Sequence, residues 1–265
     1  MSQKPFFVTI PHSGEKIPAP AEWLQNLSEE ILMRDVDRYV DRLYLPILEK
    51  LKIPHITTEW HRYAVDLNRL PEDVDQSTVV EASLAKGHER GFHWSVTTLN
   101  EKILPAPMKK SVHEDLRKIV YDPFHLKVEG CYHQLRKELN VHTIYQMDLH
   151  SMPSLGTKMH LDPGELRADV VVSDCEQKSC HSKFRDLVIA AYAISGFKVG
   201  YNWPYKGGRL SQHYGRPEKG QQVIQVELNR KLYMDEVSKK TIDNFALVKE
   251  KLARAIEYVF HNLPV

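Results

Sequence analysis

The sequence has no run of about 18 apolar residues, so it lacks the kind of segment that crosses a membrane as a helix. Residues 1–13, MSQKPFFVTIPHS, also lack the apolar stretch of a secretory signal peptide. The formal net charge is only +1, with 36 basic and 35 acidic residues, so the basic excess typical of nucleic-acid-binding proteins is missing. We therefore expect a soluble, cytoplasmic protein with no membrane or nucleic-acid partner.

Cysteine is also scarce, and its three positions show no disulfide spacing. Cys131, Cys175 and Cys180 are odd in number, which fits a reducing compartment. Cys175 and Cys180 precede His181 as a weak metal-binding pattern, but free cysteine is most often a small buried hydrophobe, and we interpret them as ordinary thiols. No repeat, low-complexity tract or Gly/Ser linker divides the chain, and we expect one domain over residues 1–265.

What the sequence does contain is an alternation of strand and helix patterns. Short β-branched or aromatic runs of strand length occur at 6–10, 55–60, 63–67, 143–149, 169–174, 197–202 and 223–228. Helical periodicity occurs at 28–51, 110–140, 182–195 and 236–262. Ser28 is a plausible N-cap, Pro46 should break or kink the first helix near its end, and Pro123 should interrupt the second. This alternation predicts an α/β domain with a mixed, mostly parallel sheet flanked by helices.

Polar side chains with catalytic potential follow or end four of the predicted strands: His12, Glu15, Asn68, Arg69, His150 and Glu227. In open α/β sheets, ligands bind beyond the carboxyl ends of the strands. A Glu inside an apolar strand is costly unless it is paired or functional. Two long irregular regions, 71–109 and 203–222, are typical of functional loops.

These residue types favour zinc. A catalytic zinc takes three protein ligands, and two His with one Glu is an established combination. His12 and Glu15 would supply two ligands from one turn, and His150 the third, with Asp148 as a candidate partner behind it. A lone HxxE is typical of a surface turn, but its combination with DLNR (66–69), DLHS (148–151) and a Glu in a strand indicates a metal site.

Some other polar residues leave two interpretations open. Asp37 and Asp41 would share one face of the helix 28–51, either as a solvated face paired with neighbouring arginines or facing the active site. His213 is either a loop residue or a substrate contact. Arg167 is either a salt-bridge partner or a substrate ligand.

Seven stretches resemble the N-formylglutamate amidohydrolase family: IPHSGE (10–15), DVDRYVDRLY (35–44), RYAVDLNR (62–69), DLHSMP (148–153), RADVVVSD (167–174), NWPYKGGRLSQHYG (202–215) and IQVELNRKLYMDE (224–236). They occur in this order over nearly the whole chain. The family is similar to the zinc carboxypeptidases and aspartoacylase, so the resemblance implies a zinc-exopeptidase-like fold.

The resemblance also implies roles for particular residues. One zinc per chain would be held by His12, Glu15 and His150, and Glu227 would be the general base. Arg62 would polarise the scissile carbonyl. Substrate carboxylates would be bound by Asn68, Arg69 and Arg209.

The expected function is that of a zinc-dependent amidohydrolase acting on a small N-acylated acidic amino acid. N-formyl-L-glutamate is the first candidate, with formate and L-glutamate as products, a step of histidine breakdown. One alternative is a zinc peptidase or amidase acting on a longer acyl or peptidyl group, such as a cell-wall peptide. Another is a catalytically silent binding protein of the same fold. No oligomeric state is predicted.

Overall fold

The computed structural model describes residues 3–82 and 88–264. Its centre is a six-stranded sheet in the order β2-β1-β3-β6-β4-β5. The strands are β1 Phe6–Ile10, β2 His55–Thr57, β3 Ile144–Met152, β4 Val170–Ser173, β5 Val199–Tyr201 and β6 Gln221–Asn229. Only β4 and β6 pair antiparallel, and the other four neighbouring pairs are parallel. The predicted mixed, mostly parallel sheet is confirmed.

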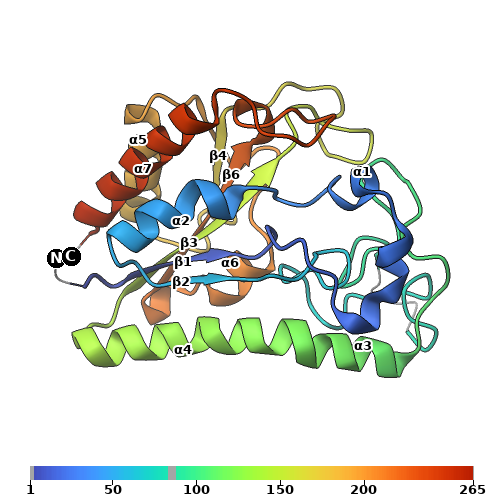
Figure 1. Cartoon of the computed structure of the whole chain (residues 1–265). Coiled ribbons are helices and arrows are strands. Elements are labelled where there is room, and N and C mark those ends of the chain that lie inside the picture. Colours follow the sequence, from blue (N-terminus) through green and yellow to red (C-terminus); the bar gives the residue numbers. More distant parts are fainter. Residues whose placement is uncertain (1–2, 83–87, 265) are drawn as a thin grey trace.

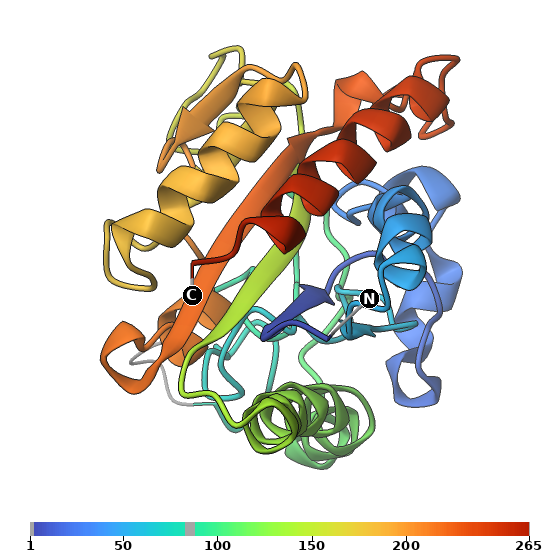
Figure 2. The same cartoon turned by 90° about the vertical axis from the view of Figure 1, so that its left-hand side faces the viewer.

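Helices cover both faces of this sheet (Figure 1). They are α1 Glu29–Leu32, α2 Val40–Lys50, α3 Lys110–Leu116, α4 Asp122–Leu139, α5 Ser182–Ile194, α6 Arg209–Tyr214 and α7 Phe245–His261. Short 3₁₀ turns span Ala19–Asn26, Pro217–Lys219 and Arg230–Leu232. The view in Figure 2 shows α2, α5 and α7 on one side of the strands and α4 on the other.

The pleat of β1 divides the apolar core between the two faces. Successive side chains of a strand point to opposite sides. Phe6, Val8 and Ile10 are therefore buried with α2, α5 and α7, while Phe7 packs edge-to-face on Tyr132 of α4 at 4.9 Å between ring centroids. Both faces of β1 are buried, as a central parallel strand requires.

The helix predicted over 28–51 is two helices with a bend between them. Ser28 is the N-cap of α1, and its Oγ accepts a hydrogen bond from the Ile31 N–H at 3.4 Å. The helix ends at Leu32, and α2 starts only after Tyr39, whose φ of 70° lies in the left-handed region. Pro46 lies inside α2 and does not end it. Burial of the apolar face of α2 outweighs the one backbone hydrogen bond that Pro46 cannot donate.

Three further element predictions need revision. Residues 63–67 form turns rather than a strand, and the Asp66 N–H donates to the Phe92 carbonyl instead of a sheet neighbour. The helix at 110–140 passes through a π-helical segment, Arg117–Tyr121, and Pro123 stands in the first turn of α4, where no N–H is needed. The last helix starts at Phe245, later than predicted.

The irregular regions lie where the sequence places them. Residues 58–82 and 88–109 contain no helix or strand, and region 203–222 contains α6, the short turn Pro217–Lys219 and the start of β6. None of the helices described has the length and apolarity that crossing a membrane would require.

Candidate active site

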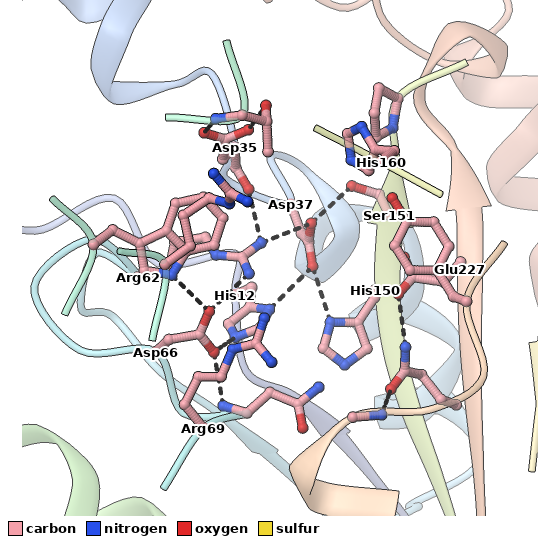
Figure 3. A pocket seen from close by; sticks show the side chains of 18 of the residues that line it. His12, Asp35, Asp37, Arg62, Asp66, Arg69, His150, Ser151, His160 and Glu227 are labelled. Atoms are coloured by element: carbon pink, nitrogen blue, oxygen red, sulfur yellow. Dashed lines mark hydrogen bonds and ion pairs between the residues drawn. The ribbon is translucent and has the colours of Figure 1, made fainter. Parts of the chain in front are cut away.

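A cavity of about 370 Å³ opens among the residues that follow or end the parallel strands β1, β3 and β6. Its walls include six of the residues selected from the sequence: His12, Arg62, Asn68, Arg69, His150 and Glu227. Figure 3 shows five of these side chains, all but Asn68, converging from different elements. The edge at which the parallel strands end is where open α/β sheets bind ligands. We therefore take this cavity as the candidate active site.

Close backbone contacts hold the turn that carries His12. A Cβ on Gly14 would lie 2.5 Å from the backbone of Glu59 and Trp60, so only glycine fits against that segment. The N–H of Asp37 donates to the His12 carbonyl at 2.9 Å. This bond joins the bend between α1 and α2 to the turn after β1, and it brings a carboxylate into the site.

Three buried side chains form a cluster with metal-binding potential: His12, Asp37 and His150. One ligand atom from each lies within 4.8 Å of the others. Asp37 Oδ2 is 3.6 Å from Nδ1 of His12 and 3.1 Å from Nδ1 of His150. All three side chains are nearly inaccessible to solvent. Two imidazoles and one carboxylate are a donor set that suits zinc.

Each histidine of the cluster is held from behind by a second carboxylate. Nε2 of His12 donates to Asp66 Oδ1 at 2.8 Å, and Nε2 of His150 donates to Asp148 Oδ2 at 2.8 Å. Carboxylates accept hydrogen bonds only, so both Nε2 atoms carry protons and each Nδ1 is directed to the centre of the cluster. Metal-binding histidines are oriented by outer carboxylates in the same way.

One unsatisfied atom shows that the cluster fits a cation. His12 Nδ1 is buried and has no hydrogen-bond partner among the described residues. A buried polar atom without a partner is costly, and a metal ion in the cluster would satisfy it. His12, Asp37 and His150 therefore fit a metal ion such as zinc.

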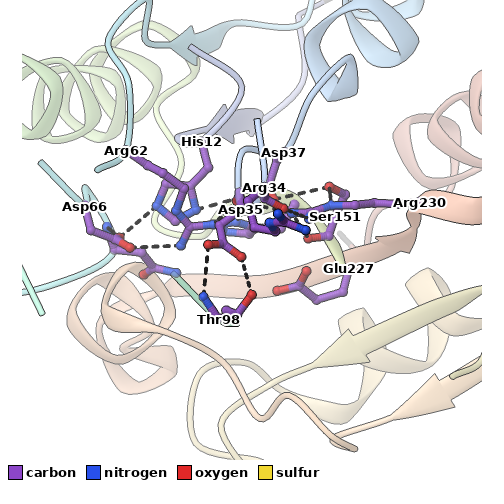
Figure 4. Close-up of polar contacts among 12 residues, drawn as sticks. His12, Arg34, Asp35, Asp37, Arg62, Asp66, Thr98, Ser151, Glu227 and Arg230 are labelled. Carbon is purple, nitrogen blue, oxygen red and sulfur yellow. Dashed lines mark hydrogen bonds and ion pairs between the residues drawn. The ribbon is translucent and has the colours of Figure 1, made fainter. Parts of the chain in front are cut away.

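Arginine holds the other oxygen of Asp37. Nη2 of Arg230 donates to Asp37 Oδ1 at 3.0 Å, and Ser151 Oγ donates to the same oxygen at 3.2 Å (Figure 4). Burial acts to raise the pKa of Asp37, but the neighbouring His12 and His150 and the charge of Arg62 outweigh it and hold the pKa well below its ordinary value. Asp37 is thus ionised, with Oδ2 left for the cluster.

The metal-free cluster favours a charged His150. Burial alone would lower the pKa of His150, but Asp148 and Asp37 outweigh that effect and raise the pKa well above its ordinary value. In this state His150 donates from both ring nitrogens. A metal ion would have to replace the proton on Nδ1.

Glu227 lies beside the cluster on the neighbouring strand. It is opposite His150 in the parallel register of β3 and β6. Gln225 donates from Nε2 to Glu227 Oε1 at 2.8 Å, and the Gly208 N–H donates to Oε1 of Gln225 at 2.7 Å. Burial raises the pKa of Glu227 to about 7, although the charge of His150 acts in the opposite direction. A carboxylate titrating near neutral pH is suited to proton transfer.

This raised pKa predicts a pH dependence of stability in chelator-treated protein. Between the ordinary value of 4.5 and about 7, folded Glu227 binds a proton that the unfolded chain releases. The free energy of unfolding should therefore fall as pH rises, by about 2–3 kcal/mol from pH 5 to 8 for this group. Urea unfolding at several pH values should show this fall in the wild type relative to Glu227→Gln. Parallel curves for the two proteins would contradict a raised pKa.

Glu15 does not join the cluster. Its Oε1 accepts a hydrogen bond from Nε of Arg38 at 3.0 Å, and Glu15 is not among the residues that line the cavity. The structure brings Asp37 to the position that the sequence reasoning assigned to Glu15. The sequence carried two signals for a special role of this segment, the like charges of Asp37 and Asp41 and the family-like stretch at 35–44, and of these two residues only Asp37 lines the cavity.

Arg62 and Asn68 reach the cavity, but both are tied to protein partners. Arg62 donates to Asp66 Oδ2 at 2.9 Å and to the Asp35 carbonyl at 2.9 Å, and its Nε has no partner within residues 3–82 and 88–264. Asn68 accepts the Leu210 N–H on Oδ1 at 2.7 Å, so its amide group is held against α6. Asp66, which the sequence reasoning did not select, connects Arg62 with His12.

The remaining candidates lie outside the centre of the site. Arg69 lines the cavity and is exposed. Arg209 is not among the lining residues, and its backbone N–H donates to the Asn68 carbonyl. Arg167 forms two hydrogen bonds with Asp162, at 2.7 and 2.8 Å, which fits the salt-bridge interpretation. His213 lines a different cavity beside α4.

Comparison with known proteins gives the same picture along nearly the whole chain. Residues 4–234 match the sequence profile of the N-formylglutamate amidohydrolases. A protein of Pseudomonas aeruginosa named N-formylglutamate deformylase is 27% identical to this chain, and the match covers 88% of this chain and 83% of that protein. A protein of the same name from Pseudomonas putida is 25% identical, and the match covers 98% of this chain and 90% of that protein.

Among solved structures, the N-formylglutamate amidohydrolase of Ralstonia eutropha has the same fold, with a TM-score of 0.87 at 24% identity over 97% of this chain and 93% of that one. The profile match covers most of the sequence and includes every residue of the cluster as well as Glu227. The chain therefore belongs to the N-formylglutamate amidohydrolase family and is an amidohydrolase.

Proposed function

We propose that this protein is a zinc-dependent amidohydrolase that cleaves N-formyl-L-glutamate to formate and L-glutamate in one catalytic domain. The observation that carries the proposal is the buried cluster of His12, Asp37 and His150 beside Glu227 in one cavity. The two Pseudomonas relatives named N-formylglutamate deformylase support the choice of substrate. The reaction would belong to histidine breakdown, and a cytoplasmic location stays a prediction.

In this proposal His12, Asp37 and His150 hold one zinc ion. When bound, such an ion supplies Lewis-acid polarisation and makes a water molecule more acidic. The chain's own contribution is to orient the ligands. Asp66 and Asp148 hold the two imidazoles with Nδ1 directed inward, and Arg230 holds the carboxylate of Asp37.

Glu227 is the proposed general base. Its Oε1 is occupied by the amide of Gln225, so Oε2 is the oxygen available to take the proton of the attacking water. The same carboxyl then donates that proton to the nitrogen of the leaving glutamate. Fixing one oxygen by a hydrogen bond keeps the other in position through both proton transfers.

Arg62 and Arg69 are the proposed cationic contacts for the substrate. Arg62 lies in the cavity wall with His12 and Asp66, where its guanidinium group would stabilise negative charge on the attacked carbonyl oxygen. Arg69 is exposed in the same wall and would bind a substrate carboxylate, together with the side-chain amide of Asn68. Arg209, outside the cavity, is not carried into this proposal.

A substrate panel tests the function. Purified protein supplied with zinc should release free amino acid from N-formyl-L-glutamate with a kcat/KM at least about tenfold higher than from N-formyl-L-aspartate or N-acetyl-L-glutamate. One methylene or one methyl group in a shaped pocket has an effect of this size. Faster cleavage of a short peptide would favour the alternative of a longer peptidyl substrate, and the absence of any turnover would favour the silent binding protein.

A further inference from the structure

Four arginines line the active-site cavity, and only two of them have carboxylate partners. Arg62 pairs with Asp66 at 2.9 Å, and Arg230 pairs with Asp37 at 3.0 Å. Among the described residues, Arg69 and Arg90 have no carboxylate oxygen within 4.0 Å of their guanidinium groups. The residues outside the described ranges, 1–2, 83–87 and 265, include no Asp or Glu. The cavity therefore has two cations available for an anionic ligand.

Arg90 is the less solvated of these two cations. Arg69 is exposed, whereas Arg90 is half-buried and its Nη1 is shielded from water with no hydrogen-bond partner. Arg34 and Arg62 also have an unpartnered Nε, but each pairs elsewhere with a carboxylate. For the guanidinium of Arg90, the described residues provide no hydrogen bond at all. Because Arg90 also lines the cavity, a ligand oxygen there would give its guanidinium group the acceptor that the described residues do not provide.

The backbone around Arg90 is well fixed. Arg90 forms an antiparallel backbone bridge with Trp94, and the backbone N–H of Arg90 donates to Nδ1 of His88 at 2.9 Å. Trp94 in turn donates to Asp66 at 3.0 Å and lies 4.7 Å below the guanidinium of Arg62. Arg90 is thus connected to the catalytic centre through one side chain, without sharing its carboxylates.

The charges in the cavity favour a carboxylate away from the cluster. Asp37, Asp66 and Glu227 surround the reacting end and would repel a second substrate carboxylate placed there. The cavity wall near Arg90 also carries the imidazoles of His88 and His160, which have no negative charge. The remaining carboxylate of the wall, Asp35, accepts hydrogen bonds from the hydroxyl groups of Tyr63 and Thr98. An anionic group remote from the scissile amide therefore finds its complement at Arg90.

We propose that Arg90 is a specificity-determining residue that binds the side-chain carboxylate of the acylated amino acid. This inference rests on the proposed function for the identity of the amino acid. The planar guanidinium group matches a carboxylate with two parallel hydrogen bonds, which a neutral amide cannot accept in the same way. Arg90 thereby selects substrates with an acidic side chain over their amides.

Replacement of Arg90 by Gln tests the inference. The wild type should prefer N-formyl-L-glutamate to N-formyl-L-glutamine, and R90Q should lower kcat/KM for the former roughly 10- to 100-fold, mainly through KM, with little change for the latter. Because Arg90 has no carboxylate partner, its loss should leave Tm nearly unchanged. A preference for N-formyl-L-glutamate that persists in R90Q would overturn the proposal.

A binding measurement separates this inference from the proposed function. Glutarate has two carboxylates and no amide to cleave, so calorimetry with glutarate does not depend on turnover. The wild type should bind glutarate at least about tenfold more tightly than R90Q, with R90K in between, because Lys keeps the charge without the planar fork. Arg254→Gln on the exposed side of α7 is the matched control. Equal affinities of wild type and R90Q, or no binding by the wild type, would sink the inference even if N-formyl-L-glutamate is hydrolysed.

Discussion

Replacing Glu227 by Gln should lower kcat roughly 10²- to 10⁴-fold while the protein keeps its metal. The substitution removes the only feature that proton transfer requires, an ionisable oxygen, and changes the side-chain volume very little. Gln225 occupies Oε1 of Glu227, and Glu227 stands opposite His150 in the sheet register. The variant therefore loses the base without losing the three groups that form the cluster.

The measurement needs two readouts on one preparation. Steady-state turnover gives kcat, and metal analysis gives the zinc content per chain, which should stay equal to that of the wild type. Glu257→Gln on α7 is a control for a Glu-to-Gln change outside the cavity, and it should leave both values unchanged. Full turnover in Glu227→Gln would remove Glu227 from the mechanism. A joint loss of zinc and activity would instead indicate that Glu227 is needed to hold the ion.

Replacing Asp37 by Asn should lower zinc affinity by at least about 10²-fold and abolish activity at limiting zinc, whereas Glu15→Gln should retain both. The reason is geometric, because Asp37 Oδ2 faces the Nδ1 atoms of both histidines. Glu15 instead forms a partly buried ion pair with Arg38. The wild type should contain about one zinc per chain, and a chelator should remove both the ion and the activity.

Asp37→Asn also weakens the fold, which calls for a second measurement. Breaking the buried pair with Arg230 leaves a buried charge without its partner, at a cost of about 3–5 kcal/mol. Thermal unfolding of the chelated proteins gives this structural cost separately from metal binding. His12→Gln should lose zinc with a smaller structural cost, because no residue in the described part of the chain pairs with His12 Nδ1 when the metal is absent. The proposed cluster would be wrong if Glu15→Gln lost zinc while Asp37→Asn and His12→Gln retained it.

Several features of this protein could be predicted from the sequence. Six of the seven predicted strands exist, and the apolar residues of β1, β3, β4 and β6 are buried on the sheet. His12, His150 and Glu227 follow or end three of these strands. Because neighbouring parallel strands end at the same edge, residues 138 positions apart, His12 and His150, meet there. Side chains alternate between the two faces of a strand, and parallel strands end at the same edge of the sheet. Few arrangements of the strand ends are then possible, so a pattern of strands with polar ends predicts which histidines come together.

Other features depended on contacts between distant segments. The apolar spacing of 28–51 is also compatible with one continuous helix, and it hides the bend that ends at the left-handed Tyr39. The hydrogen bond from Asp37 to the His12 carbonyl stabilises this bend, and it is a contact between two segments that no local pattern encodes.

Side-chain direction is a second property that local sequence leaves undetermined. Glu15 is three residues from His12 and still points to Arg38, because an oppositely charged partner from the bend lies within reach. Arg209 and Arg90 show the same principle in opposite ways. The conspicuous GGR motif leaves its arginine outside the cavity, while an unremarked loop arginine lines it. The strand positions and the polar residues at the strand ends follow from the periodicity of burial in the sequence. The third proposed metal ligand and the cations without a carboxylate partner depend instead on which charges the folded chain brings within hydrogen-bonding distance.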